Sequence, residues 1–149
     1  MPSLTRTCPR VSGNPPTRGL IDTNVVILLN QLDPAELPDE MVISAVTLAE
    51  LSTGPHHAPE PTERARRTSL LQHVEATFDP LPFDTAAARL FGLITASVLA
   101  AGRNPRGRFA DLMIASTAAA SRLPLFTTNP KDFAGLDAHV RVVPVTWPR

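Results

Sequence analysis

The order of apolar and polar positions along the chain predicts short strands that alternate with helices. Leu20 and Ile21 form a brief apolar run typical of a strand, and the apolar spacing of residues 25–29 predicts a helix directly after it. MVISAV, residues 41–46, predicts a second strand that runs into a helix, which we expect to end at Gly54. Each of these strands is therefore expected to lead straight into a helix.

The rest of the chain continues this alternation. A proline-rich connection precedes a polar helix, and the segment FDPLPFD leads into a helix with one apolar face that ends near Gly102. A basic loop over residues 101–108 precedes the helix FADLMIASTAAASR, and LPLFTTN and residues 140–145 predict two further strands. This order is typical of the α/β class and predicts a three-layer α/β/α domain with a mainly parallel sheet. In such sheets ligands bind beyond the carboxyl ends of the strands.

The length and composition of the chain favour one folded domain. With 149 residues, two independent domains would each have a marginal core. Hydrophobic residues make up 43% of the chain and charged residues 19%, which is a globular balance. We expect a single domain over residues 19–149. Residues 1–18 contain four prolines and no apolar periodicity, which predicts a flexible N-terminal extension.

Charge and cysteine content narrow the class of protein further. The formal net charge is zero, so a nucleic acid would have to be held by a local basic patch or by metal ions. Cys8 is the single cysteine, and the N-terminus lacks the pattern of a signal peptide. The longest weakly polar run, residues 90–102, is shorter than the roughly 20 residues that a membrane-spanning helix needs. We therefore expect a soluble, cytoplasmic protein that does not associate with membranes.

Three acids stand in apolar sequence, in LI-D-TNVV, TLA-E-LST and RFA-D-LMIA. Asp22 follows a predicted strand, Glu50 lies in the first turns after another, and Asp111 opens a third helix. A buried carboxylate without compensation is protonated or destabilising, so it normally needs a cation, a helix N-terminus or a metal ion. Three converging carboxylates favour a hard divalent ion such as Mg²⁺ or Mn²⁺, because these ions prefer oxygen ligands.

Each acid also has a purely structural interpretation. Asp22 could only cap its helix, and Asp111 could be a first-turn acid that the helix dipole stabilises. Glu50 could complete a T-x-x-E capping box that starts at Thr47. If Ser44 caps the helix instead, Glu50 lies deeper in the helix and is free to face a site. The sequence leaves these alternatives open.

The segments GLIDTNVVI, ISAVTLAELSTG, ADLMIASTA and LFTTNPKDF, followed by a closing VVPV, together resemble a PIN-domain ribonuclease of the VapC toxin type. The resemblance covers about residues 19–145, with the motifs in the family's order. It implies an endoribonuclease that cleaves RNA with Mg²⁺ or Mn²⁺ and is inhibited by a small cognate antitoxin in its active-site groove. Asp22, Glu50 and Asp111 match the family's catalytic, metal-binding acids by position. We also expect a homodimer.

The chain departs from the family at the fourth acidic position, which follows the strand-end threonine. Asn129 occupies that position and Asp132 follows three residues later, so either could complete the site. An asparagine offers a neutral oxygen but no charge, so we expect the RNA-free protein to bind at most one Mg²⁺ or Mn²⁺ ion well. The other residues that could orient a carboxylate, a water or a phosphate, or could equally be turn and cap residues, are Thr23, Asn24, Thr127 and Thr128.

Arginines near the acids are candidates for RNA binding. Arg103, Arg106 and Arg108 come immediately before Asp111, so their guanidinium groups could reach phosphates that enter the site. A solvated loop is the equally good alternative. We interpret the arginines within residues 64–67 as a solvated helix face.

Two other classes of protein remain open. A catalytically silent interaction module on the same fold is one, and Asn129 leaves room for it. An aspartate-based phosphotransfer domain is the other, because it places acids at strand ends and uses a late lysine, and Lys131 is the only lysine. The DTN motif, however, lacks the second acid of a D-x-D phosphatase. A nuclease assay with and without Mg²⁺ separates the three classes.

Overall fold

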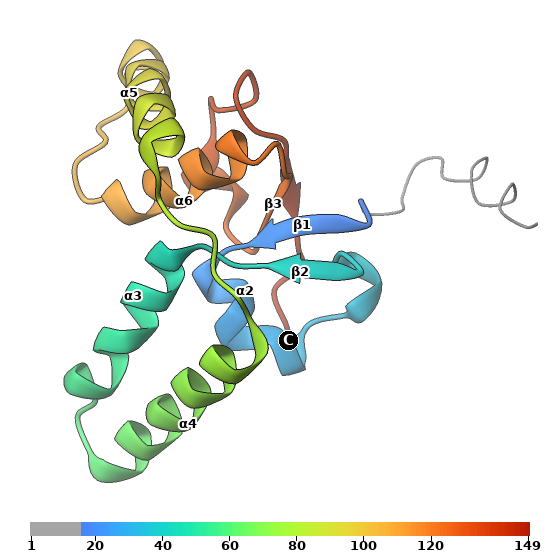
Figure 1. Ribbon diagram of the computed structural model, residues 1–149, viewed down its shortest axis with the longest axis vertical. Helices are drawn as coiled ribbons and strands as arrows, with labels where there is room; N and C mark the ends of the chain where they lie inside the picture. The colour runs from blue at the N-terminus through green and yellow to red at the C-terminus, as the bar shows by residue number, and fades with distance from the viewer. Residues whose placement is uncertain (1–15) are drawn as a thin grey trace, which may run out of the picture.

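The computed structural model describes residues 16–149, and its helices and strands follow one another in the predicted alternation (Figure 1). The strands are β1 (Arg18–Ile21), β2 (Glu40–Val42), β3 (Leu125–Thr127) and β4 (Val142–Pro144). The α-helices are α2 (Thr23–Leu28), α3 (Ala45–Thr53), α4 (Pro61–Thr77), α5 (Thr85–Ala100) and α6 (Phe109–Ala120). Four short 3₁₀ turns complete the described chain, namely η1 (Leu29–Gln31), η2 (Pro34–Glu36), η3 (Gly54–His57) and η4 (Pro130–Phe133).

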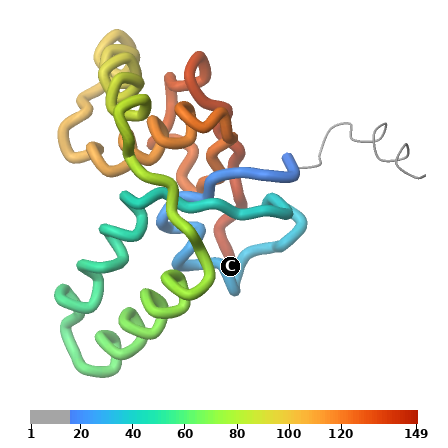
Figure 2. Tube along the Cα trace, in the orientation of Figure 1, coloured from blue at the N-terminus to red at the C-terminus, as the bar shows by residue number. Residues whose placement is uncertain are grey.

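The four strands form one sheet in the order β2-β1-β3-β4, and every pairing in it is parallel. The register places Leu20 beside both Val42 and Leu125, and Leu125 beside Val142. The predicted mainly parallel sheet is thereby confirmed. Because the strands are parallel, their carboxyl ends share one edge of the sheet, and β1 and β2 run into α2 and α3 on the same side of the molecule (Figure 2).

Alternation along the strands produces the three layers. Successive side chains of a strand point to opposite faces of the sheet, so Leu20 and Leu125 join the core beneath α5 and α6. Ile21 and Phe126 join the core beneath α2, α3 and α4. Figure 1 shows the two groups of helices on opposite sides of the sheet. Burial of both faces explains why the strands are short, nearly continuous apolar runs.

One glycine is required for this packing. A Cβ added at Gly19 in β1 would lie 2.3 Å from Cε1 of Phe126. Real Cβ atoms do not approach another heavy atom so closely, so the Phe126 ring can cross β1 only where no side chain stands. The glycine thus serves a close approach within the sheet.

The second strand is shorter than the predicted residues 41–46, because β2 ends at Val42. Beyond Val42 the chain pairs with Leu81 in an isolated parallel bridge, in which the Leu81 amide donates to the Ile43 carbonyl at 2.9 Å. The Ser44 side chain then accepts a hydrogen bond from the Val46 amide at 2.9 Å and starts α3. A polar side chain that could cap a helix therefore ended the strand inside an apolar run.

Two further expectations concern the N-terminal residues and membrane-spanning helices. Most of the predicted flexible extension, and Cys8 with it, lies outside the described residues; of residues 1–18 only 16–18 are described, and Arg18 already begins β1. Within residues 16–149 no helix is both long enough and apolar enough to cross a lipid bilayer.

Candidate functional site

Asp22 lies directly after β1 and is buried, with 5% of its surface exposed. It caps α2, because its Oδ1 accepts a hydrogen bond from the Val25 amide at 3.2 Å. Its Oδ2 accepts a second hydrogen bond from the Thr127 hydroxyl at 2.5 Å, and Thr127 Oγ1 accepts in turn from the Asn129 amide at 2.9 Å. Capping therefore occupies one carboxylate oxygen, while the end of β3 fixes the other.

The environment of Asp22 works against its charge. Burial raises the pKa of this carboxyl, and the negative charge of Glu50 raises it further, while the hydrogen bonds from Thr127 and the backbone oppose the rise. The net effect is a pKa above the ordinary value of 3.8. A nearby cation would reverse this penalty.

Glu50 does not form the capping box, because Ser44 rather than Thr47 caps α3. Its Oε1 instead accepts a hydrogen bond from the hydroxyl of Thr23, in α2, at 2.5 Å. The hydroxyls of Thr23 and Thr47 lie 3.0 Å apart, so Thr47 can donate to Thr23 while Thr23 donates to Glu50. This hydroxyl chain ties α3 to the first residue of α2 and holds the Glu50 carboxylate, which is exposed, beside that helix.

Asp111 is half-buried in the first turn of α6. Burial is the main reason that its pKa rises to about 6, and the charges of Asp132, Asp22 and Glu50 raise it in that order, while Arg108 lowers it. A helix N-terminus on its own would lower the pKa of a carboxyl. Asp111 does lie in the first turn of α6, but burial and the charges of the three other acids outweigh any effect of the helix N-terminus on its pKa.

The fourth position contains both candidate residues, in different roles. Asn129 precedes η4 and makes no side-chain cap there. Asp132 lies within η4, in the short helical turn expected after Pro130. Its Oδ1 lies 3.4 Å from a guanidinium nitrogen of Arg108, and it contributes the largest neighbouring negative charge to Asp111. Asp132 thus lies close enough to Asp111 for its charge to act there, although it is partly exposed.

The arginines of the basic loop differ from one another. Arg103 donates to the Lys131 carbonyl at 3.1 Å, and Arg108 donates to the Asp132 carbonyl at 2.7 Å. Both guanidinium groups therefore brace the loop against η4. Arg106 is exposed, and its backbone amide donates to the Asn104 side chain at 2.9 Å. Of the three, Arg106 has the side chain most available to a ligand.

The donor set fits a hard divalent cation in its chemistry. Asp22, Glu50, Asp111 and Asp132 offer only oxygen atoms, and burial and mutual repulsion raise the pKa of two of them, as expected of acids that need positive charge. Across residues 16–149, no three acidic, histidine or cysteine side chains come close enough together to form a ready-made metal site. The acids therefore affect one another through charge without forming a closed ligand set.

The side chains that contact the candidate acids could not be read from the sequence. Thr127 rather than Thr128 supports Asp22; the Thr128 hydroxyl is buried and has no hydrogen-bond partner in the described part of the chain. The sequence signal for Thr127 was its place at the end of a strand, but its neighbour shares that signal. Asn24 is exposed in α2 and contributes a backbone hydrogen bond to Asp22.

Comparisons with known proteins give concordant results. The PIN domain family matches the chain over residues 20–138. Ribonuclease VapC5 of Mycobacterium tuberculosis is 39% identical over 130 residues, which are 85% of this chain and 93% of that protein. The tRNA(fMet)-specific endonuclease VapC of Shigella flexneri is 33% identical over 121 residues, which are 76% of this chain and 88% of that protein. The crystal structure of VapBC-5, a member of the VapBC family of toxin-antitoxin systems from Mycobacterium tuberculosis, has a TM-score of 0.76 at 38% identity, and the match covers 89% of this chain and 100% of that chain.

Proposed function

Because the chain belongs to the PIN-domain family, and within it to the VapC toxins of toxin-antitoxin systems, we propose that it is a divalent-metal-dependent endoribonuclease that a cognate antitoxin inhibits. The family resemblance and the three-layer fold are confirmed. The metal ion, the RNA substrate, the antitoxin and the roles of individual residues belong to the proposal.

The crowding of acids around Asp111 is the observation that supports the proposal most. The charges of Asp132, Asp22 and Glu50, which come from three other segments, act on Asp111, and with burial they raise its pKa to about 6. Such an arrangement destabilises the folded protein unless positive charge compensates it. A divalent cation held by Asp22, Glu50 and Asp111 supplies that charge.

The chemistry divides between the ion and the chain. When bound, Mg²⁺ or Mn²⁺ supplies activation of water and neutralisation of charge on the phosphodiester. Asp22, Glu50 and Asp111 would hold the ion. Thr127 keeps Asp22 Oδ2 oriented and Thr23 keeps Glu50 Oε1 oriented, so that these oxygens do not have to be ordered when the ion binds. In the metal-free protein the pKa of Asp111 is raised to about 6, so protons compete with the ion for this carboxylate as the pH falls.

A protein inhibitor suits the same site. The VapBC-5 structure, by its description, is of a toxin-antitoxin system. An inhibitor that directs a basic side chain, most naturally arginine, toward the carboxylates would compete with both the ion and the RNA. Copurification of the chain with the product of its neighbouring gene tests this part, and absence of binding between the two would remove it from the proposal.

The expected homodimer also belongs to the proposal. Leu93 and Leu99 of α5 are 57% and 58% exposed, and a Cβ added at Gly92 would meet no atom within 4 Å. Exposed apolar side chains on an open helix face suit contact with a second protein surface. Light scattering on the purified chain measures its oligomeric state directly.

A nuclease assay on the purified chain tests the activity. Wild type should cleave RNA with Mg²⁺ and not with a chelator, and Asp22→Asn and Asp111→Asn should each abolish cleavage. Asp39→Asn is the matched control, because Asp39 is an exposed acid before β2, at the opposite edge of the sheet. Undiminished cleavage by both site variants would refute the assignment of the acids.

Wild type that cleaves no RNA would instead favour the catalytically silent module. The aspartate-based phosphotransfer domain makes a different prediction, because it would form an acid-stable or hydroxylamine-sensitive phosphoryl adduct at an aspartate rather than cleave RNA.

A further inference from the structure

A cleft of about 870 Å³ lies between α2, α3 and α4. On its α2 side stand two amide side chains, Asn24 and Asn30, and the apolar side chain of Ile27, which is 49% exposed. Leu51 of α3 and Leu70 of α4 also line it. This α2–α4 cleft therefore combines an apolar lining with hydrogen-bonding groups at its rim.

The α4 side of the cleft supplies positive charge. Arg66 and Arg67 line it together with His73, and Glu63 is the acid of that helix that faces them. Glu63 accepts hydrogen bonds from Arg66 at 2.7 Å and from Arg67 at 2.8 Å. Arg67 is fixed by a further bond to the Gly54 carbonyl at 3.0 Å, whereas the Arg66 side chain is 76% exposed. Arg66 is therefore the cation that can move to a ligand.

The cleft reaches the acidic site at Glu50. Of the four acids, Glu50 lines the cleft, together with Thr23, to which it is joined by the 2.5 Å hydrogen bond. A ligand in the cleft can therefore lie beside both Glu50 and the α4 arginines. With Glu50 engaged by a cation, the remaining charged lining consists of two arginines and one glutamate, so the cleft favours an anion.

We propose that the α2–α4 cleft holds the single-stranded RNA next to the phosphodiester that is cut, with Arg66 as its phosphate contact. This inference rests on the proposed ribonuclease activity, to which it adds the path of the substrate. Bases of unpaired RNA have apolar faces and hydrogen-bonding edges. Ile27 and Leu70 can contact the faces, and the amides of Asn24 and Asn30 can bond to the edges. The guanidinium group suits the phosphate between them.

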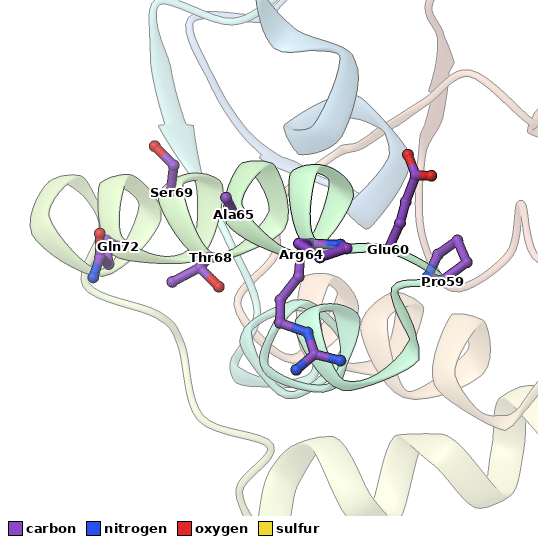
Figure 3. Close-up of a pocket in the computed structure, with 8 residues that line it drawn as sticks. Pro59, Glu60, Arg64, Ala65, Thr68, Ser69 and Gln72 are labelled. Atoms are coloured by element: carbon purple, nitrogen blue, oxygen red, sulfur yellow. The ribbon is translucent and has the colours of Figure 1, made fainter.

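The size of the cleft selects a single strand. The volume of the cleft, about 870 Å³, is similar to that of pockets that enclose a drug-sized molecule. The cleft can therefore hold a few nucleotides but not a double helix. The interpretation of the arginines within residues 64–67 as a solvated face then no longer applies to Arg66 and Arg67, which line the cleft. Arg64 lies on the opposite side of α4, where it lines a separate groove with Thr68 and Gln72 (Figure 3).

That opposite groove provides matched controls on the same helix. Arg66→Gln, in the cleft, is compared with Arg64→Gln, in the opposite groove. His73→Asp, in the cleft, is likewise compared with Gln72→Asp, in the opposite groove. The second pair leaves the Glu63 ion pairs intact. Binding of a fluorescein-labelled oligouridine is measured with Mg²⁺ in an Asp111→Asn background, in which the RNA stays intact, and is repeated with a labelled RNA duplex.

Arg66→Gln should weaken oligouridine binding about threefold to tenfold and reduce the salt dependence of the affinity by about 0.7 in slope, as the loss of one phosphate contact predicts. Arg64→Gln should change the affinity by less than about twofold. His73→Asp should weaken binding more than Gln72→Asp, and the duplex should bind more weakly than the single strand. In the active protein, Arg66→Gln should raise KM with little change in kcat.

Equal effects within both pairs, or equal binding of duplex and single strand, would overturn the inference. So would an Arg66→Gln variant that binds oligouridine normally but has lost affinity for the antitoxin, because the cleft would then serve the protein partner. If wild type cleaves RNA but the two variants of each pair bind oligouridine equally, the ribonuclease proposal stands and only the proposed RNA path is refuted. Wild type that binds no RNA removes both.

Discussion

Replacing Asp111 by asparagine should stabilise the metal-free protein at neutral pH. The carboxyl has a folded-state pKa of about 6 and an ordinary value of 3.8. The folded protein therefore holds the proton more tightly than the unfolded chain, so ionisation of Asp111 costs stability as the pH rises from about 4 through 6. Asparagine keeps the shape of the side chain and removes the charge that burial and the neighbouring acids disfavour.

The magnitude follows from the same values. A rise of the pKa from 3.8 to about 6 corresponds to about 3 kcal/mol of unfolding free energy above pH 6. Asp111 is only half-buried, so solvent screening reduces the expected gain to roughly 1–2 kcal/mol. At pH 4 and below, the wild-type carboxyl is largely protonated, and the gain should disappear.

Urea unfolding in the presence of a chelator, at pH 4, 5, 6 and 7, measures this dependence. Asp39→Asn serves as the control, because Asp39 is an exposed acid before β2, at the opposite edge of the sheet from Asp111. This variant should show no increase in unfolding free energy that grows with pH. Mg²⁺ should stabilise wild type at pH 7 more than it stabilises Asp111→Asn, which keeps Asp22 and Glu50 as ligands. If Asp111→Asn were no more stable than wild type at pH 7 in chelator, the electrostatic reasoning would be wrong.

Substitutions at four further positions test the residues around the acids and the packing of the sheet. Thr127→Val removes the hydroxyl that orients Asp22 and should lower the rate of RNA cleavage about tenfold. Thr127→Ser keeps a hydroxyl at this position and should retain most of the wild-type rate. Equal activity of the two variants would contradict the role of this hydrogen bond. Gly19→Ala forces a Cβ against an aromatic ring and should lower the unfolding free energy by about 1–3 kcal/mol, as measured in urea. Asp132→Ala should reduce cleavage less than Asp111→Ala, and Asn129→Asp should strengthen Mn²⁺ binding; calorimetry that finds two tight Mn²⁺ sites in the RNA-free wild type would contradict this view of the fourth position.

The fold could be predicted from the sequence because its determinants are local or periodic. The apolar face of α5 is visible in the spacing of its residues, and the buried strands are visible as short apolar runs. The end of β2 could not be predicted in this way. MVISAV is apolar almost throughout, and the strand ends within it because Leu81, distant in the sequence, pairs there and Ser44 caps a helix.

The candidate acids could be selected from the sequence, but their contacts could not. Asp22 and Asp111 are recognisable as carboxylates in apolar sequence, since burial of charge is rare without compensation. The partner of Glu50 is Thr23, which comes from a different helix, and no pattern along the chain connects the two. Side-chain direction after a strand is likewise set by the sheet, so the choice between Thr127 and Thr128 required the structure.

The fourth position shows how one residue can be both a surface acid and part of the site. Asp132 has a carboxylate that is partly exposed and paired with Arg108, which by itself describes an ordinary surface ion pair. Its charge nevertheless acts on Asp111 more strongly than the charges of Asp22 and Glu50 do. Asn129 cannot supply such charge, because its side chain is neutral. Asp132 is therefore the residue of the fourth position whose loss should lower the pKa of Asp111, and the comparison of Asp132→Ala with Asp111→Ala separates this effect of charge from direct binding of the ion.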